Sequence, residues 1–483
     1  SPEQLTIVQG ILKDHLPKGT LAWAFGSRVT WTAKPFSDLD IALEGAAPLP
    51  SDVLIDLKEA FEASDLPWKV DVIDLNAVSP EFRAIVEQQR VQVIFDVWLR
   101  DELGKYMDFS NGKSSPERTE SGSFPVYGSN GLIGWSEQFN APAGTTIIGR
   151  VGSYCGSTHY SRVPCWVTDN AIKATAKNEK EHRFWNYALE NQNLHTLRSG
   201  SGQPLINQTS LKALELVIPP KDQRLPIGEL LASLDDKIEL NRRMNETLEA
   251  MARAVFRDWF VDFGPTRRKT AGLTDPAAIL GGLLPDPPKA APLAALFPDG
   301  FGGNGLPEGW ELERLDRYLG LAYGKALTKK DRVEGDYPVY GSGGISGSHN
   351  VPLENGPAII VGRKGTVGSL YWEDRDFFAI DTVFYVVPKT RLSFLFYILE
   401  TLGLEHMNTD AAVPGLNRNN VYRLERAFGC EATRNVFADL ADQFRAMIRN
   451  NEQENQILAA TRDLLLPKLM SGELRLTGAE GAA

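Results

Sequence analysis

The segment at 123–134, SFPVYGSNGLIG, returns at 336–347 as DYPVYGSGGISG, 213 residues further along the chain. Three later blocks repeat in the same order and at nearly the same offset. They align Arg150 with Arg363, Asp169 with Asp381, and Asn207 with Asn417. Separate blocks in one order at a nearly constant offset indicate an internal repeat, here a duplicated unit of about 210 residues.

Each copy ends in a long helical pattern. Apolar residues and asparagines recur there in alternating steps of three and four, which is typical of a coiled-coil seam. These positions are Leu231, Leu234, Ile238, Asn241, Asn245, Leu248, Ala252 and Val255 in the first copy, and Phe437, Phe444, Ile448, Asn451, Asn455, Leu458 and Leu465 in the second. Polar seam residues can set the register, so the two helices are expected to pack on each other. The alternative is that each helix only caps its own domain.

The rest of each copy has the features of a mixed α+β domain. Short β-rich runs such as TTIIGRV, AIIVGRK and FYVVPK are separated by glycine-rich turns, and they predict strands that form a platform. Between the copies, residues 264–308 are rich in Pro, Gly and Ala without sustained periodicity. We expect this stretch to be an irregular connector.

The charge distribution bears on the possible partners. The net charge is −11, which argues against a protein that grips nucleic acid alone through a general basic surface. Residues 1–100 hold 15 acidic and 9 basic side chains, whereas residues 101–220 hold 11 of each and residues 310–430 hold 15 and 14. The repeated segments are therefore nearly neutral. They could read bases while a partner subunit supplies much of the phosphate contact.

Several classes of protein are excluded or disfavoured by composition. The three cysteines lack CxxC spacing and the six histidines are scattered, so neither a disulfide framework nor a zinc site is supported. No P-loop or S-adenosylmethionine glycine loop is evident. No apolar run reaches the length of a membrane span, and the start lacks the pattern of a secretory signal. We expect a cytoplasmic protein.

The motifs LPEGWELERL, PVYGSxG, II-G-R-x-G, L-N-x and LLPKLMSGEL, two of them present in both copies, resemble the specificity subunit of type I restriction-modification systems over residues 98–476. The resemblance implies two target-recognition domains that each read half of a split DNA site, held apart by an antiparallel pair of helices. The expected parts are recognition domains at 98–221 and 309–430, spacer helices at 222–263 and 431–476, the connector at 264–308 and a tail at 477–483.

The same resemblance implies particular partners. In this family the subunit is not itself a catalyst; it binds double-stranded DNA and recruits two methyltransferase subunits, which use S-adenosylmethionine, and then restriction and translocase subunits. Two recognition domains at a fixed separation recognise one long DNA sequence with a central gap, in place of two independent short sequences. A scaffold that binds only protein is the competing interpretation, but the loops after YGS and GR differ where the frames match.

Base reading requires polar side chains on loops that reach groove edges. The candidates are Lys113, Arg118, Ser129, Asn130 and Arg150 in the first copy, and Lys329, Lys330, Ser342, Arg363 and Lys364 in the second. Arg150 and Arg363 occupy equivalent places in copies that are expected to read different words. They are therefore expected to hold phosphate or a scaffold contact rather than to select a base. Asn207 and Asn417 are expected to form turns.

The first hundred residues contain a second constellation. LAWAFGSRVTWTAKPFSDLDIAL holds a GS pair, then ten residues, then D-x-D at the start of an apolar strand, and WKVDVIDL adds another strand with carboxylates. Asp38 and Asp40 are two apart on a strand and so point to the same face. Clustered carboxylates are what two hard cations need in phosphoryl and nucleotidyl transfer.

This constellation resembles the minimal nucleotidyltransferases of the polymerase-β-like superfamily over residues 5–97, and we expect a small α/β domain at 1–97. The resemblance implies that Gly26 and Ser27 hold the nucleotide phosphates. It implies that Asp38, Asp40 and Asp71 bind two Mg²⁺ ions and, with Ser27, form the catalytic set. Asp74 is the alternative to Asp71 as the third carboxylate.

Three other interpretations of the first hundred residues stay open. SDLD could be a charged turn, the fold could be retained without activity, or this domain could be the main activity, a magnesium-dependent enzyme localised by DNA-binding repeats. Related small proteins of the superfamily act with a HEPN-type toxin and modify it with AMP from a nucleoside triphosphate. A HEPN-type protein is therefore a possible partner.

Overall fold

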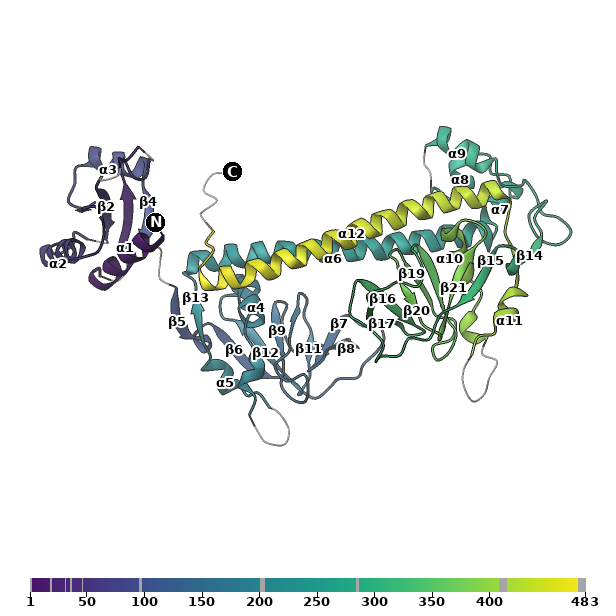
Figure 1. The fold of residues 1–483 in the computed structure, drawn as a ribbon, viewed down its shortest axis with the longest axis horizontal. Helices are drawn as coiled ribbons and strands as arrows, with labels where there is room; N and C mark the ends of the chain where they lie inside the picture. The colour runs from purple at the N-terminus through teal and green to yellow at the C-terminus, as the bar shows by residue number, and fades with distance from the viewer. Residues whose placement is uncertain are drawn as a thin grey trace. The chain divides into compact units, whose positions relative to one another are not determined.

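The computed structural model describes residues 2–17, 20–30, 32–34, 37–45, 47–94, 98–199, 205–283, 286–407 and 415–476. The expected tail at 477–483 and the expected boundary at residue 97 lie outside these ranges. The chain divides into two compact units, one comprising Ser1–Asp236 with Leu458–Ala483 and the other Lys237–Ile457. Element labels are those of Figure 1.

The N-terminal domain, purple in Figure 1, is a four-stranded sheet in the order β3-β2-β1-β4 with helices on both faces. Its elements are α1 (Pro2–His15), β1 (Leu21–Phe25), β2 (Leu39–Glu44), α2 (Ser51–Glu62), β3 (Val70–Asp74), α3 (Pro80–Gln88) and β4 (Val91–Ile94). Ile41 and Leu43 of β2 are buried with Leu12 and Leu57 from α1 and α2. Ala42, which points to the opposite face, is buried with Val86 of α3. The alternation of β2 therefore sets a helix layer on each side of the sheet.

The first copy of the repeat lies in the same unit and is built from three small sheets, in the orders β10-β9-β12-β6, β11-β7-β8 and β13-β5. Its elements are β5 (Leu99–Glu102), β6 (Met107–Asn111), β7 (Phe124–Gly128), β8 (Gly131–Ser136), β9 (Thr145–Gly149), β10 (Thr158–Ser161), β11 (Trp166–Val167), β12 (Ala171–Ala176), α4 (His182–Glu190), α5 (Gln208–Lys212) and β13 (Glu215–Ile218).

The second copy, in the other unit, has the same strand order in each sheet: β19-β18-β21-β15, β20-β16-β17 and β22-β14. Its elements are β14 (Leu312–Arg314), β15 (Leu319–Tyr323), β16 (Tyr337–Gly341), β17 (Gly344–His349), β18 (Ala358–Gly362), β19 (Leu370–Glu373), β20 (Phe378–Ala379), β21 (Val383–Pro388), α10 (Leu392–Glu400), α11 (Arg418–Tyr422) and β22 (Glu425–Ala427). The sequence repeat is thus a repeat of topology, and the expected mixed α+β, multidomain fold is confirmed.

Two long helices follow the copies, α6 (Lys221–Phe260) and α12 (Glu431–Ser471), and both are prominent in Figure 1. The seam asparagines meet: Asn241 Nδ2 donates to Glu454 Oε2 (2.7 Å) and Asn455 Oδ1 (3.0 Å), and Asn451 Nδ2 donates to Asn245 Oδ1 (2.8 Å). One residue number rises as its partner's falls, so the helices are antiparallel along this contact. Knobs-into-holes packing over the whole length stays a prediction.

The end of α12 contributes to the core of the first unit. Leu469 and Met470 are buried with Trp185 and Leu231 of that unit. Just beyond them, Gly472 lies against Trp98, and a Cβ at this glycine would come within 2.8 Å of the indole ring. The first copy therefore completes its core with residues from the far end of the chain.

The expectation of an irregular connector at 264–308 is wrong. In its described residues, 264–283 and 286–308, it forms α7 (Gly264–Thr270), α8 (Pro276–Ile279) and α9 (Pro287–Ala294), each with a proline in its first turn. Apolar side chains from it are buried in the core of the second unit, and they include Ile279, Leu280, Ala290, Ala294 and Phe297. Prolines at helix starts stabilise such short helices, although the same residues weaken any periodic signal in the sequence.

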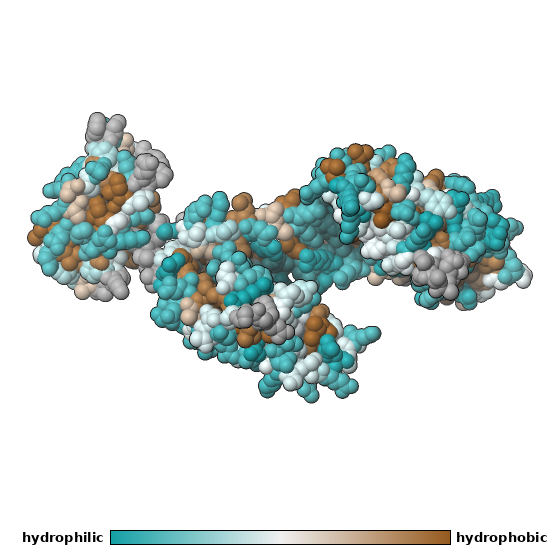
Figure 2. Space-filling model, turned by 60° about the horizontal axis from the view of Figure 1, so that its bottom comes forward, coloured by the Kyte–Doolittle hydropathy of each residue, from teal (hydrophilic) through white to brown (hydrophobic). Residues whose placement is uncertain are grey.

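The surface seen in Figure 2 is mostly hydrophilic, with small apolar patches distributed over it. Exposed apolar side chains on the long helices include Leu240, Met244, Ile457 and Leu464. Among the helices of the described residues, none combines the length and the apolar run that crossing a membrane requires.

Replacing Asn241 with alanine is expected to destabilise the helix pair locally by about 1–3 kcal/mol, because Glu454 and Asn455 would lose a buried donor. Hydrogen exchange of the α6 amides, followed by mass spectrometry, measures this loss. Arg243→Ala is the control, because its side chain is 71% exposed and its ion pair with Glu239 lies on the surface; it should cost less than about 0.5 kcal/mol. Equal effects of the two variants would contradict the prediction.

Candidate functional site

The carboxylates of the N-terminal domain come together through the pairing of its strands. Strands β2 and β3 are parallel, and their register sets Asp40 directly beside Asp71. On its other side, Asp40 is paired with Phe25, the last residue of β1, and Gly26 follows at once. Asp38 precedes β2 by one residue. The predicted phosphate-binding glycine and the predicted acidic set therefore meet at one end of the sheet.

The carboxylates influence one another electrostatically. Burial raises the pKa of Asp40, and the neighbouring negative charges of Asp71 and Asp38 raise it further. Like charges that share a half-buried site disfavour ionisation, which is the behaviour of carboxylates gathered to hold a cation.

Asp71 and Asp74, between which the sequence left a choice, have different surroundings. The Asp71 carboxylate is 45% exposed and forms an ion pair with Lys69 at 2.5 Å. The Asp74 side chain is buried and accepts hydrogen bonds from the backbone N–H groups of Leu49 (2.7 Å) and Asn76 (2.9 Å). Asp74 is thus occupied in holding two loops. Asp71 is the carboxylate that faces the other acids.

The donor chemistry fits a divalent cation, but the ligand set is not assembled. Within the described residues, no group of three or more His, Cys, Asp or Glu side chains is arranged to hold a metal ion. Lys69, which the sequence interpretation missed, instead neutralises part of the charge by its ion pair with Asp71. A cation bound by Asp38, Asp40 and Asp71 together would share the Asp71 carboxylate with Lys69 or compete with Lys69 for it.

The loop between β1 and β2 is held by Arg28, a second residue that the sequence interpretation missed. Its guanidinium donates to the carbonyl of Ser37 through Nε at 2.8 Å and Nη2 at 2.5 Å, and it lies over the Trp68 ring at 4.5 Å from the centroid. Ser37 is the residue immediately before Asp38. Arg28 therefore connects the glycine–serine turn to the first acid of the set.

In the two repeat copies, the predicted base-reading serines lie in matching hairpin turns. Ser129 and Asn130 join β7 to β8, and Ser342 is in the turn between β16 and β17. The Ser129 hydroxyl donates to the carbonyl of Asn170 at 2.5 Å, so this hydroxyl is already used within the domain. Asn130 is exposed at the tip. Of this pair, Asn130 is the residue available for an external contact.

The repeated arginines have matching internal contacts. Arg150 Nη1 donates to the carbonyl of Asp169 at 3.5 Å, and Arg363 Nη1 donates to the carbonyl of Asp381 at 3.0 Å. Arg363 also lies over the Tyr323 ring, 4.8 Å from its centroid. Each arginine thus has a contact within its own domain, which is one of the two roles expected for it; the other, a contact with phosphate, stays a prediction.

The remaining cationic candidates are exposed, and the structure identifies counterparts that the sequence comparison missed. The predicted residues Lys113, Arg118, Lys329, Lys330 and Lys364 are all exposed. Lys113 pairs its backbone with Thr168 as Lys325 does with Ile380, and Arg118 donates to Ile133 as Arg332 does to Ser346. The counterparts of Lys113 and Arg118 are therefore Lys325 and Arg332. Loops of different length hid them from an alignment at constant offset.

Asn207 and Asn417 have the structural role that was expected, in the specific form of helix caps. The Asn207 side chain accepts from the backbone N–H of Ser210 at 2.8 Å and caps α5. The Asn417 side chain accepts from Asn419 at 2.9 Å and caps α11. Such caps stabilise short helices, and they account for both asparagines without a nucleic-acid contact.

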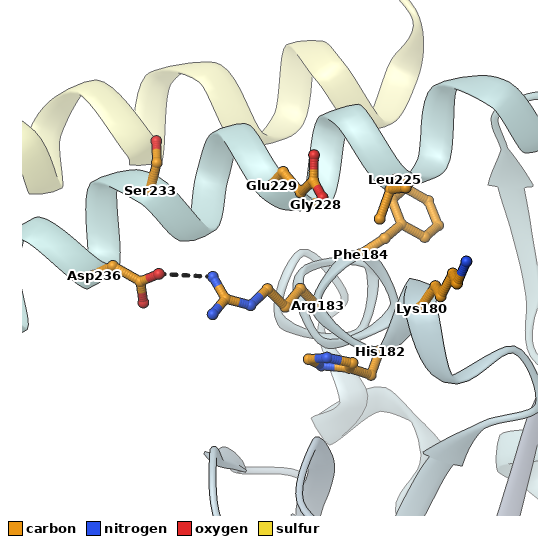
Figure 3. Close-up of a pocket in the computed structure, with 9 residues that line it drawn as sticks. All are labelled: Lys180, His182, Arg183, Phe184, Leu225, Gly228, Glu229, Ser233 and Asp236. Atoms are coloured by element: carbon orange, nitrogen blue, oxygen red, sulfur yellow. Dashed lines mark hydrogen bonds and ion pairs between the residues drawn. The ribbon is translucent and has the colours of Figure 1, made fainter.

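A hollow of about 340 Å³ lies between the start of α4 and the first part of α6 in the first unit (Figure 3). Its lining carries both signs of charge, and the main polar contact joins Arg183 Nη1 to Asp236 Oδ2 at 2.8 Å. Phe184 packs so closely on α6 that a Cβ at Gly228 would be 2.7 Å from its backbone nitrogen. The hollow is thus the margin of a helix contact that fixes the first copy to α6.

Comparison with known proteins gives the family. The model of the type I restriction modification DNA specificity domain matches residues 101–250 and 307–421, which are more than half of the chain. The chain belongs to this specificity family.

Relatives of the specificity family include the type I restriction enzyme HindI specificity subunit of Haemophilus influenzae. It is 28% identical over 339 residues, which cover 57% of this chain and 72% of that protein. The crystal structure of the type I restriction-modification S subunit from M. genitalium has a TM-score of 0.51 at 18% identity, covering 80% of this chain and 99% of that one. This likeness shows that the fold is shared.

The N-terminal domain has its own relatives. The polymerase beta nucleotidyltransferase model matches residues 8–96. The probable protein adenylyltransferase MntA of Haemophilus influenzae is 46% identical over 91 residues, which cover 19% of this chain and 79% of that protein. This member of the specificity family therefore carries a nucleotidyltransferase domain in front of its repeats. The roles of individual residues in both parts stay predictions.

Replacing Gly26 with alanine is expected to weaken binding of Mn²⁺ and nucleotide by about 10- to 100-fold, because the new Cβ would displace the Asp40 carboxylate, and disturbing the orientation of a metal ligand costs affinity on this scale. Gly26 has φ +78°, and a Cβ would lie 2.5 Å from Asp40 Oδ2. The measurement is binding of Mn²⁺ and labelled nucleotide by the full chain.

Gly10→Ala is the matched control for Gly26→Ala, because Gly10 is in helix α1 and a Cβ there meets nothing within 4 Å. It should bind as the unsubstituted chain does and be slightly more stable, because alanine is the better helix former. Unchanged binding by Gly26→Ala would show that this turn is not the nucleotide site.

Proposed function

We propose that the chain reads a bipartite DNA site for a type I restriction-modification complex in the cytoplasm. The observation that carries the proposal is that two copies with the same strand order present hairpin turns of different sequence, Ser129–Asn130 in one and Ser342–Gly343 in the other. A shared fold with turns of different sequence suits two domains that recognise different DNA half-sites. Contacts with base edges specify sequence, whereas contacts with phosphates only position the protein.

The low positive charge of this chain supports the proposal of partner subunits. Its net charge of −11 gives it little capacity to hold DNA by phosphate neutralisation alone. We propose that two methyltransferase subunits, which use S-adenosylmethionine, supply this grip and the chemistry, and that restriction and translocase subunits join them. The relatives named as specificity subunits of type I restriction enzymes support such an assembly.

The proposal predicts that residues 101–220 determine one half of a methylation motif. Cells that express this chain with its methyltransferase should carry a split motif that is absent without the chain, and sequencing of methylated sites detects it. Exchange of residues 101–220 for those of a relative should change one half of the motif, and exchange of residues 310–430 should change the other half. A motif that is independent of the chain, or one that changes in both halves at once, would contradict the proposal.

For the N-terminal domain, we propose transfer of AMP from ATP to a nucleophilic side chain of a protein partner of the HEPN type, with release of pyrophosphate. The 46% identity to a probable protein adenylyltransferase and the carboxylates gathered around Asp40 support it. Asp38, Asp40 and Asp71 would hold Mg²⁺, which when bound neutralises phosphate charge. Gly26 would allow the close approach of a phosphate, and the Ser27 hydroxyl would add a hydrogen bond.

The alternative that nucleotidyl transfer is the main activity and the repeats only localise it is not favoured. The specificity-family match covers more than half of the chain, and the nucleotidyltransferase match covers residues 8–96 alone. We propose instead that the two activities coexist and are separable. Each has its own buried core within the chain.

Asp40→Asn should lower AMP transfer by about 100-fold or more, because one carboxylate of the cation site is lost. The measurement is incorporation of α-phosphate label from ATP, with Mg²⁺, into a candidate HEPN-type protein. Asp56→Asn, at an exposed position of α2, is the matched control and should transfer normally. Neither substitution should alter the methylation motif. Equal labelling by all three chains would contradict transfer at this site.

A further inference from the structure

The β7-β8 and β16-β17 hairpins, which are proposed to read DNA, are held by the same kind of hydrogen bond. The carbonyl oxygen of the first turn residue accepts a hydrogen bond from the hydroxyl of a serine that immediately precedes β10 in the first copy and β19 in the second. Ser157 Oγ donates to Ser129 at 2.7 Å, and Ser369 Oγ donates to Ser342 at 2.6 Å. The chain has therefore kept this support in both copies, although the turns themselves differ in sequence.

A ring completes each support, and here the copies differ. The glycines that close the turns, Gly131 and Gly344, have φ of +92° and +97°. A Cβ on Gly131 would lie 3.0 Å from Cε1 of His159, and a Cβ on Gly344 would lie 3.4 Å from Cε1 of Tyr371. Each ring thus packs directly against the backbone that begins the second strand of its hairpin.

The ring in the second copy also holds the turn by a hydrogen bond. Tyr371 Oη donates to the carbonyl of Ser342 at 3.1 Å, so that carbonyl has two supporting donors. The imidazole of His159 is in the corresponding place. Burial lowers its pKa, the backbone of Ser129 opposes that change, and Nε2 is buried without a hydrogen-bond partner. A buried polar atom without a partner is costly, so its presence requires a reason.

We infer that His159 is a positioning residue that sets the height and tilt of the Ser129–Asn130 turn, as Tyr371 does for the turn at Ser342. The inference rests on the proposed function, because it assumes that these turns read DNA. It assigns to each half-site one residue that makes no contact with DNA itself. Without the ring, the turn would move toward the sheet, and discrimination between matched and changed base pairs would fall in that half-site alone.

The test uses the full chain with its methyltransferase and DNA duplexes that carry one changed base pair in either half of the motif. The measured quantity is the ratio of affinities for the matched and changed duplexes, taken separately for each half. His159→Ala should lower discrimination in one half by about tenfold, within the range of a lost base contact, and leave the other half unchanged. Tyr371→Ala should give the mirror result.

Rescue distinguishes positioning from general damage. His159→Tyr installs the residue that the second copy uses, and it should restore discrimination to within about twofold of the unsubstituted chain. Equal losses in both halves for His159→Ala, or no recovery with His159→Tyr in a chain that melts normally, would overturn the inference.

Asn130→Ala separates failure of the inference from failure of the proposed function. If Asn130→Ala lowers discrimination and His159→Ala does not, the hairpin reads DNA and His159 does not position it. If neither substitution lowers discrimination, the hairpin does not read DNA, and the proposed function of this turn fails together with the inference.

Discussion

The aromatic cluster around Phe260 is the contact on which the second unit depends. Its ring lies 5.0 Å from Phe394 of the second copy, 5.8 Å from Phe437 of α12 and 5.9 Å from Trp310 at the start of the copy. Trp259 beside it is 5.1 Å from Phe297 of the connector. Each buried aromatic side chain contributes about 1.5–3 kcal/mol of transfer free energy, and ring pairs add about 0.5–1.5 kcal/mol. One cluster therefore joins both long helices, the second copy and the connector. The position of the β16-β17 hairpin depends on the packing of these rings.

Much of this architecture could be predicted because duplication makes a strong signal. The matched YGS turns, the equivalent arginines and the asparagine seams all indicated two similar α+β units with long helices. The connector could not be predicted in the same way, because Pro276 and Pro287 begin its helices while also interrupting the pattern by which helices are detected. Equally, Lys325 and Arg332 became visible as counterparts of Lys113 and Arg118 only through backbone pairing and hydrogen bonds.

The acidic set shows a similar division between what spacing predicts and what packing decides. The i, i+2 spacing of Asp38 and Asp40 indicated one face of a strand. It could not show that Asp71 lies beside Asp40 in a parallel pair, that Asp74 is used by the backbone of Leu49, or that Lys69 already neutralises Asp71. The first two are contacts between segments that lie 31 and 25 residues apart in the sequence. Burial raises the pKa of Asp40, and the negative charges of Asp71 and Asp38 raise it further, so the contacts between these segments change the chemistry of the carboxylate as well as its position.

The core of the first unit has a consequence for synthesis on the ribosome. Leu469 and Met470 are buried among residues of the first copy, and Gly472 packs closely on Trp98. At translation rates of about 5–20 residues per second, the first copy waits on the order of ten to fifty seconds between its own completion and the arrival of these side chains. During that interval its apolar interior is open to water and to other chains. Premature termination of translation, even within α12, would therefore yield a protein in which the core of the first copy is incomplete. Quality-control factors would recognise this exposed core and not the missing C-terminal segment itself.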